Sequence, residues 1–111
     1  MQNEQSAVEE LELSVAHATK LKELKDAILR LQKNRDFKKV FISELFQKEP
    51  ARITALLTDH NMLDQRNLLV EDLMVISGVQ TWLRSKIALG ETAERSINEA
   101  RRISEEIEDE G

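Results

Sequence analysis

The sequence predicts an all-α fold, and three observations carry the prediction. Only one residue of the 111 is proline, only three are glycine, and none is cysteine or tyrosine. The chain is rich in Leu, Ala, Glu, Lys and Arg, which have good helix propensity. Apolar residues recur at spacings of three and four along most of the chain. We therefore expect a helical hairpin or small bundle, with long N- and C-terminal amphipathic helices around a compact middle. Such a fold excludes most enzyme architectures.

Size and composition indicate a single domain, residues 1–111. Hydrophobic residues make up 41% of the chain and charged residues 33%, a balance that suits a folded soluble protein. The absence of cysteine excludes disulfides and cysteine-based zinc sites. The N-terminus has no basic n-region and no apolar h-region, so we expect no secretory signal. No apolar run reaches the ~18–20 residues of a membrane span. We expect a cytosolic protein that binds no membrane.

Charge is strongly segregated along the chain, although the net charge is only −5. Both ends are acidic, whereas Lys20 to Lys39 contains eight basic and three acidic residues. This basic stretch is read as a solvated helix face, as a partner for the acidic ends, or as a phosphate-binding surface. Its basic residues share a helix side only roughly, and no helix-turn-helix sequence follows. We therefore expect no nucleic-acid binding.

The N-terminal segment, about residues 6–34, predicts a long helix with a narrow apolar seam. Ser6 and Glu9 form a capping-box pattern at its start. The apolar residues follow spacings of three and four, as in a coiled coil. They are Val8, Leu11, Val15, Ala18, Leu21, Leu24, Ile28 and Leu31. A helix with so lean a seam needs a partner, inside or outside the chain.

The middle of the chain, about residues 36–89, predicts a compact core of three shorter helices. Asn34 or Asp36 caps a helix over 37–48, which Glu49-Pro50 ends because the residue before proline disfavours helical ψ. Pro50 starts a short third helix. Asp64 caps a fourth helix with a wide apolar face. Within it Gly78 is expected to permit a close helix approach, and Gly90 to end or bend the helix.

The C-terminal segment, about residues 91–109, again predicts a helix whose narrow apolar seam is surrounded by charged residues. The two lean terminal helices either pair as an antiparallel hairpin or await another subunit, and both alternatives stay open. Phe41, Phe46 and Trp82 are either core residues or exposed anchors for a partner. The candidate partner-binding residues are Leu11, Val15, Leu21, Leu24, Ile28, Leu31, Phe41, Phe46, Trp82, Ile97, Ile103 and Ile107.

The chain carries no recognisable constellation for catalysis or for metal binding. His17 and His60 are 43 residues apart with no carboxylates at ligand spacing. Asp59, His60 and Ser77 lack the strand–turn–helix context of a nucleophile. We expect no enzymatic activity, no cofactor and no metal.

Several short motifs resemble a group of small helical proteins encoded among the virion genes of tailed bacteriophages. The motifs span about residues 24–97, and residues 41–47 lack the Gly-Tyr/Phe-Phe sequence of that group. They are Asn34–Val40, Ala51–Ile53, Leu56–Leu57, Ile76–Gly78, Trp82–Leu83 and Leu89–Ala93. The resemblance implies a non-enzymatic virion or assembly component, found in the host cytoplasm during assembly or in the virion.

Two functions remain as hypotheses. In the first, the chain docks its helices onto a larger virion protein or onto its own copies, as a homo- or hetero-oligomer. In the second, it is a small acidic regulatory binder that inhibits a host enzyme or the host transcription machinery. The identity of the partner separates the two.

Overall fold

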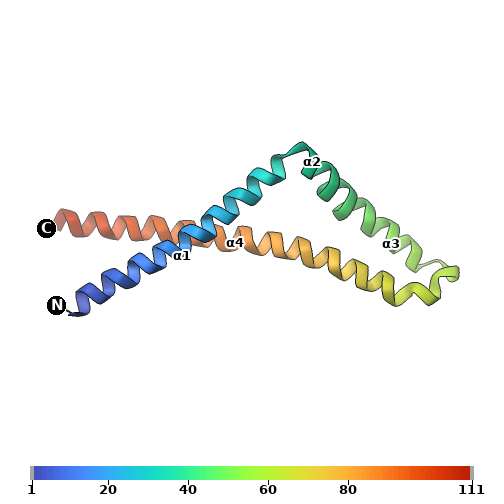
Figure 1. Cartoon of the computed structure of the whole chain (residues 1–111), viewed down its shortest axis with the longest axis horizontal. Coiled ribbons are helices and arrows are strands. Elements are labelled where there is room, and N and C mark those ends of the chain that lie inside the picture. Colours follow the sequence, from blue (N-terminus) through green and yellow to red (C-terminus); the bar gives the residue numbers. More distant parts are fainter. Residues whose placement is uncertain (1, 111) are drawn as a thin grey trace. The chain divides into compact units, whose positions relative to one another are not determined.

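A computed structural model describes the backbone of residues 2–110 and the side chains of residues 5–109. The described chain consists of helices and short connections, with no strand (Figure 1). The predicted all-α fold, with long helices at both ends, is confirmed. In order the elements are α1 (Gln2–Lys33), α2 (Arg35–Phe37), η1 (Lys38–Lys48), α3 (Glu49–Leu57), η2 (His60–Gln65) and α4 (Arg66–Glu110).

The chain divides into two compact units, and each is described by itself. Unit 1 combines Met1–Ile28 with Lys86–Gly111, so that it pairs most of α1 with the second half of α4. Unit 2 spans Leu29–Ser85 and contains the end of α1, all the short elements and the first half of α4.

Unit 1 is an antiparallel pair of helices. The terminal helices therefore pair with each other within the chain, as in the first of the two predicted alternatives, the antiparallel hairpin. The buried apolar residues are small where the two helices meet: Ala18 on α1, and Ala93 and Ala100 on α4. Ile28 is also buried at the end of this unit. Small side chains let helix backbones approach closely.

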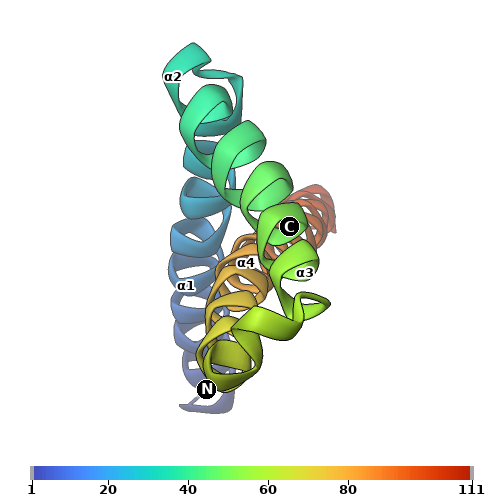
Figure 2. The same ribbon diagram turned by 90° about the vertical axis from the view of Figure 1, so that its right-hand side faces the viewer.

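Unit 2 packs one helical rod against the first half of α4. Elements α2, η1 and α3 follow each other without a change of direction (Figures 1 and 2). The core consists of Ile53 from α3 with Leu69 and Ile76 from α4. The half-buried side chains that pack around it are Leu45, Phe46, Leu56, Leu57 and Leu73. Phe37 and Phe41 stack at the start of the rod, with ring centroids 4.8 Å apart.

The predicted helix break at Glu49-Pro50 is wrong. Glu49 has helical angles (φ −63°, ψ −47°), and α3 continues directly from η1 with Pro50 in its first turn. The reason lies in η1, which is a π-helix: the Glu49 N–H donates to the carbonyl oxygen of Glu44, five residues back. In an α-helix the proline ring clashes with the carbonyl one turn earlier. A π-helical turn is wider, and it makes room for the ring.

Helix starts also differ from those predicted. Ser6 lies inside α1, which already begins at Gln2, so the capping-box prediction is wrong. Asn34 does cap α2, because its Oδ1 accepts from the backbone N–H groups of Asp36 and Phe37, each at 3.0 Å. Asp36 lies within that helix. Asp64 lies within η2 and does not cap α4, because Asp59 has already started η2 by accepting from the Asn61 N–H.

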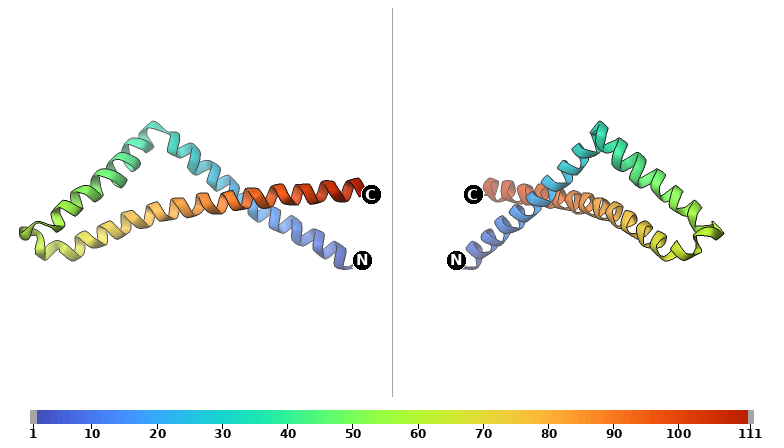
Figure 3. Two further views of the ribbon diagram at one scale, coloured as in Figure 1. Left: turned by 180° about the vertical axis from the view of Figure 1, so that it is seen from behind. Right: turned by 45° about the vertical axis from the view of Figure 1, so that its right-hand side comes forward.

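Helix α4 runs without interruption from Arg66 to Glu110 (Figure 3). The predicted stop at Gly90 is therefore wrong, as is the predicted separate helix over 91–109. Neither Gly78 nor Gly90 has a positive φ, the backbone conformation by which glycine usually ends a helix. A single glycine costs a helix only ~1 kcal/mol, which packing along this long helix outweighs.

Candidate helix-docking surfaces

The closest approach in unit 1 lies at Gly90. A Cβ atom at this position would overlap Cβ of Lys25 and lie 3.0 Å from the carbonyl oxygen of Leu21. At Gly78, by contrast, a Cβ atom would meet nothing within 4 Å. The prediction that Gly78 permits close packing is therefore wrong for the folded chain, and Gly90 has that role.

An ion pair between a buried lysine and a partly exposed glutamate lies beside this close approach. Lys25 is buried, and its Nζ donates to Glu94 Oε2 on α4. Asp26, which also accepts from Lys22 at 2.8 Å, lies 3.6 Å from the same ammonium. The hydrogen bond to Glu94 raises the pKa of Lys25 above its ordinary value of 10.5, against the opposing effect of desolvation. This ion pair accounts for part of the basic stretch Lys20 to Lys39, because Lys25 from that stretch neutralises the carboxylate of Glu94 on α4.

We expect Glu94→Gln to destabilise the protein at neutral pH and to lose this effect in alkali. Because folding raises the pKa of Lys25, the pair contributes stability fully below pH 10.5, and this contribution disappears as pH rises through the folded-state value. Urea denaturation of both proteins between pH 7 and about pH 11.5, followed by circular dichroism, measures it. A difference in unfolding midpoint that stays constant across this range would contradict the assignment.

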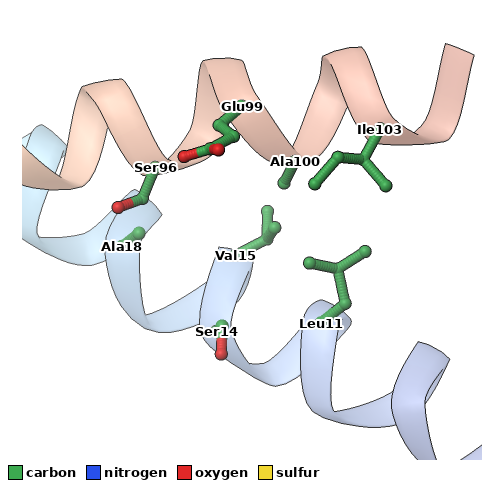
Figure 4. A pocket seen from close by; sticks show the side chains of 8 residues that line it. All are labelled: Leu11, Ser14, Val15, Ala18, Ser96, Glu99, Ala100 and Ile103. Atoms are coloured by element: carbon green, nitrogen blue, oxygen red, sulfur yellow. The ribbon is translucent and has the colours of Figure 1, made fainter. Parts of the chain in front are cut away.

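Away from Gly90, the helix pair leaves apolar grooves on two sides. The first groove encloses about 190 Å³ and the second about 440 Å³. Leu11, Val15 and Ala100 line both grooves. In Figure 4 the side chains of Leu11 and Val15 point toward Ala100 and Ile103, with open space between them, and the Ser14 hydroxyl points away. Two helices cannot cover both sides of their own seam, so these grooves stay open to a further helix.

The surroundings of the grooves are mainly acidic. Glu99 borders the first groove, and Glu12 and Arg101 border the second. Residues 5–13 and 96–109 together carry eight acidic and two basic side chains. Apolar walls between acidic borders favour an amphipathic helix with basic residues on either side of its apolar stripe.

In unit 2 the first half of α4 exposes a second apolar surface. One side of this segment faces the core through Leu69 and Ile76, but its other sides also carry large apolar residues. The exposed ones are Leu68, Val70, Met74, Val75, Val79 and Trp82. We call this set the outer face of α4. Trp82 is half exposed, at 50%.

The structure places the predicted partner-binding residues in four kinds of environment. Leu11, Val15, Ile97 and Ile103 line the grooves of unit 1. Ile28 is buried, and Leu21 is half-buried beside Gly90. Phe46 packs against the core of unit 2. The remaining five are exposed: Leu24, Leu31, Phe41, Trp82 and Ile107.

Sequence reasoning missed the outer face of α4 apart from Trp82. Val75 is exposed, although it belongs to the wide apolar face that predicts a core helix, and Met74, which that face does not include, is exposed as well. The signal that could have found them is the length of the uncharged run, because no residue from Leu73 to Leu83 is charged. An uncharged run of this length covers every side of a helix, and one neighbouring helix covers only one side.

The described part of the chain also bears on metal binding and on membrane insertion. Among these residues, no three His, Asp or Glu side chains come together as a metal ion requires. No helix in the described part is long and apolar enough to cross a bilayer. Comparison of the chain with protein-family models, with curated proteins and with solved structures finds no match.

Proposed function

We propose that this chain is a non-enzymatic structural or assembly protein that docks its helices onto a larger protein of a phage virion. The observation that carries the proposal is the pair of open apolar grooves in unit 1 (Figure 4). After α1 and α4 have paired, the groove walls formed by Leu11, Val15 and Ile103 remain uncovered. A third helix would bury them and complete a three-helix packing. The motif resemblance over residues 24–97 supports the assignment to virion or assembly proteins.

The acidic borders of the grooves define the partner's docking element. It is an amphipathic helix with an apolar stripe of spacing three and four and with Lys or Arg beside the stripe. Such flanking charges raise the association rate and set the orientation, while the apolar stripe supplies most of the affinity. We therefore expect binding that weakens with salt but persists at high salt.

Val15→Asp tests the docking site. It places a carboxylate between the walls of both grooves, and we expect at least about a tenfold loss of affinity for the partner. The tagged wild-type chain and the variant capture proteins from cells that produce the virion, and mass spectrometry identifies the partner. Leu13→Asp is the matched control, because Leu13 lies on the same helix, is exposed and lines neither groove.

A virion protein retained by the wild type and by Leu13→Asp, but lost with Val15→Asp, supports the proposal. Circular dichroism checks that both variants keep the helix content of the wild type. A virion partner that both variants bind equally would place docking elsewhere and contradict the assignment to the grooves.

The acidic borders also favour a second candidate function, a regulatory binder that inhibits a host enzyme or the host transcription machinery. Acidic residues around an apolar groove suit the basic helices of proteins that bind nucleic acid. The same capture experiment separates the two functions, because it then retains a stoichiometric host enzyme instead of a virion protein.

A further inference from the structure

A polar hollow in unit 2 has no part in the docking described above. It encloses about 230 Å³, and its lining comes from the end of α1, from η1 and from α4. The lining residues all belong to unit 2, and none of them is acidic. Four of them carry side chains that donate hydrogen bonds: Gln32, Gln47, Gln80 and Arg84.

These four side chains are not used by the fold. Gln32 lies on α1, Gln47 on η1, and Gln80 and Arg84 on α4. In the part of the chain that the structure describes, none of the four side chains has a hydrogen-bond or ion-pair partner. The chain has six glutamines, and three of them line this one hollow. Unused donors from three elements therefore border a single space.

Charge makes the hollow a site for an anion. An arginine guanidinium is permanently charged, and its fork of N–H groups matches the two oxygens of a carboxylate. Lys33, directly after Gln32 and exposed, adds to the positive potential. Glu44, three residues before Gln47, already accepts from Lys48 at 2.9 Å. The positive charge of Arg84 is thus left for a ligand.

The other walls of the hollow define the kind of anion. Ile42, Phe46 and Leu83 are apolar and line the same space. One guanidinium balances the single charge of a carboxylate, whereas a phosphate group carries close to two charges. Sites for drug-sized ligands enclose about 300–1,000 Å³, so this smaller hollow suits a group of side-chain size. A carboxylate on a short apolar chain satisfies both kinds of wall.

We propose that this hollow binds a monocarboxylate carried on a short apolar chain. The guanidinium of Arg84 pairs with the carboxylate and occupies two of its about four acceptor positions, and the glutamine amides donate to the others. The apolar chain lies against Phe46 and Leu83. A free organic acid and the glutamate side chain of a bound protein share this chemistry. The site uses no residue of the grooves in unit 1, so this inference does not rest on the proposed function.

Titration of the ¹⁵N-labelled full chain with butyrate, followed by NMR, tests the proposal. We expect saturable shifts of the side-chain amide signals of Gln32, Gln47 and Gln80, with a dissociation constant of about 1–10 mM. Gln5 and Gln65 are internal controls, because they do not line the hollow. Chloride is kept at about 20 mM, since salt screens the guanidinium. If the five signals moved equally, or none moved, the site would not exist.

Two kinds of probe separate the carboxylate from the apolar chain and identify its source. Butanol and butylammonium carry the same chain without the carboxylate, and we expect no saturable shift with either. Equal binding of butanol and butyrate would show an apolar hollow only and overturn the proposal. Glutamate with acetyl and amide blocking groups presents the carboxylate as a protein does. The tighter binder of this compound and butyrate identifies the source, and failure of both to bind overturns the proposal.

Arg84→Gln tests the residue that carries the charge. Arg84 is exposed, so the variant should fold, and circular dichroism checks this. We expect butyrate to bind at least about tenfold more weakly, and Arg84→Lys to lie in between, because an ammonium keeps the charge but not the fork. Arg35→Gln is the matched control: Arg35 is exposed in the same unit and does not line the hollow. Wild-type affinity in Arg84→Gln, or equal weakening in both glutamine variants, contradicts the assignment.

Failure here is separable from failure of the docking function. Loss of butyrate binding in Arg84→Gln concerns unit 2 alone, and capture of the partner through Val15 concerns unit 1 alone. Either result can therefore fail while the other stands.

Discussion

Gly90→Ala is expected to destabilise the protein, although Gly78→Ala, in the same helix, is expected to stabilise it. Alanine has the higher helix propensity, so each change alone favours the folded helix by about 1 kcal/mol. At Gly90 the added methyl group overlaps Cβ of Lys25 and approaches the Leu21 carbonyl oxygen. Neither atom is the free end of a flexible side chain. Overpacking of this kind costs about 1–3 kcal/mol, which outweighs the gain in propensity.

The two glycines are controls for each other. Urea denaturation followed by circular dichroism at 222 nm gives the free energy of unfolding for both variants. Opposite signs are expected. If both variants were stabilised by a similar amount, α1 and α4 would not pack closely at Gly90.

The contrast between the glycines marks the limit of what the sequence could predict. Periodicity identified the helices, because apolar spacings of three and four reflect burial of one helix side. A glycine in a helix signals only that a side chain is missing. Whether another helix lies beside it depends on which residues approach from elsewhere in the chain, and Leu21 and Lys25 are nearly 70 residues away from Gly90.

The helix ends were predictable only where a local side chain decides them. The helix cap at Asn34 was predicted correctly, because a capping side chain accepts hydrogen bonds from backbone amides only two and three residues further along the chain. Pro50 was correctly placed in the first turn of the third helix, but the predicted break before it was wrong, because that prediction assumes an α-helical turn ahead of the proline. The π-helical turns of η1 remove that assumption, and no recognisable sequence motif announces them.

The docking surfaces were predicted in part for a similar reason. Leu11, Val15 and Ile103 belong to narrow apolar stripes on the terminal helices. The side chains of such a stripe stay partly exposed whichever helix packs against it. Met74 and Val75 belong to an uncharged run with apolar residues on more than one side, and the sequence does not say which sides its neighbours cover. Only the packing of Ile53 against Leu69 and Ile76 identifies the inner side, and the outer side follows from it.

Ile53→Ala is expected to unfold unit 2. Ile53 is 1% exposed and lies between Leu69 and Ile76, so truncation removes three carbon atoms from the centre of the core. Such substitutions cost about 2–5 kcal/mol. Cores of units below about 70 residues supply only about 3–5 kcal/mol in total, so the loss is comparable with the entire stability of unit 2. Trp82, the only tryptophan, reports this unfolding by its fluorescence.

Leu63→Ala is the matched control, because Leu63 lies in the same unit but is 53% exposed on η2. Its effect should remain within about 0.5 kcal/mol. In thermal denaturation Ile53→Ala should lose the cooperative change in Trp82 fluorescence, whereas Leu63→Ala should keep it near the wild-type midpoint. Part of the helix signal should survive in Ile53→Ala, because the contacts of unit 1 at Gly90, Ala93 and Lys25 do not involve Ile53. A cooperative transition at the wild-type temperature would instead mean that this core does not hold unit 2 together.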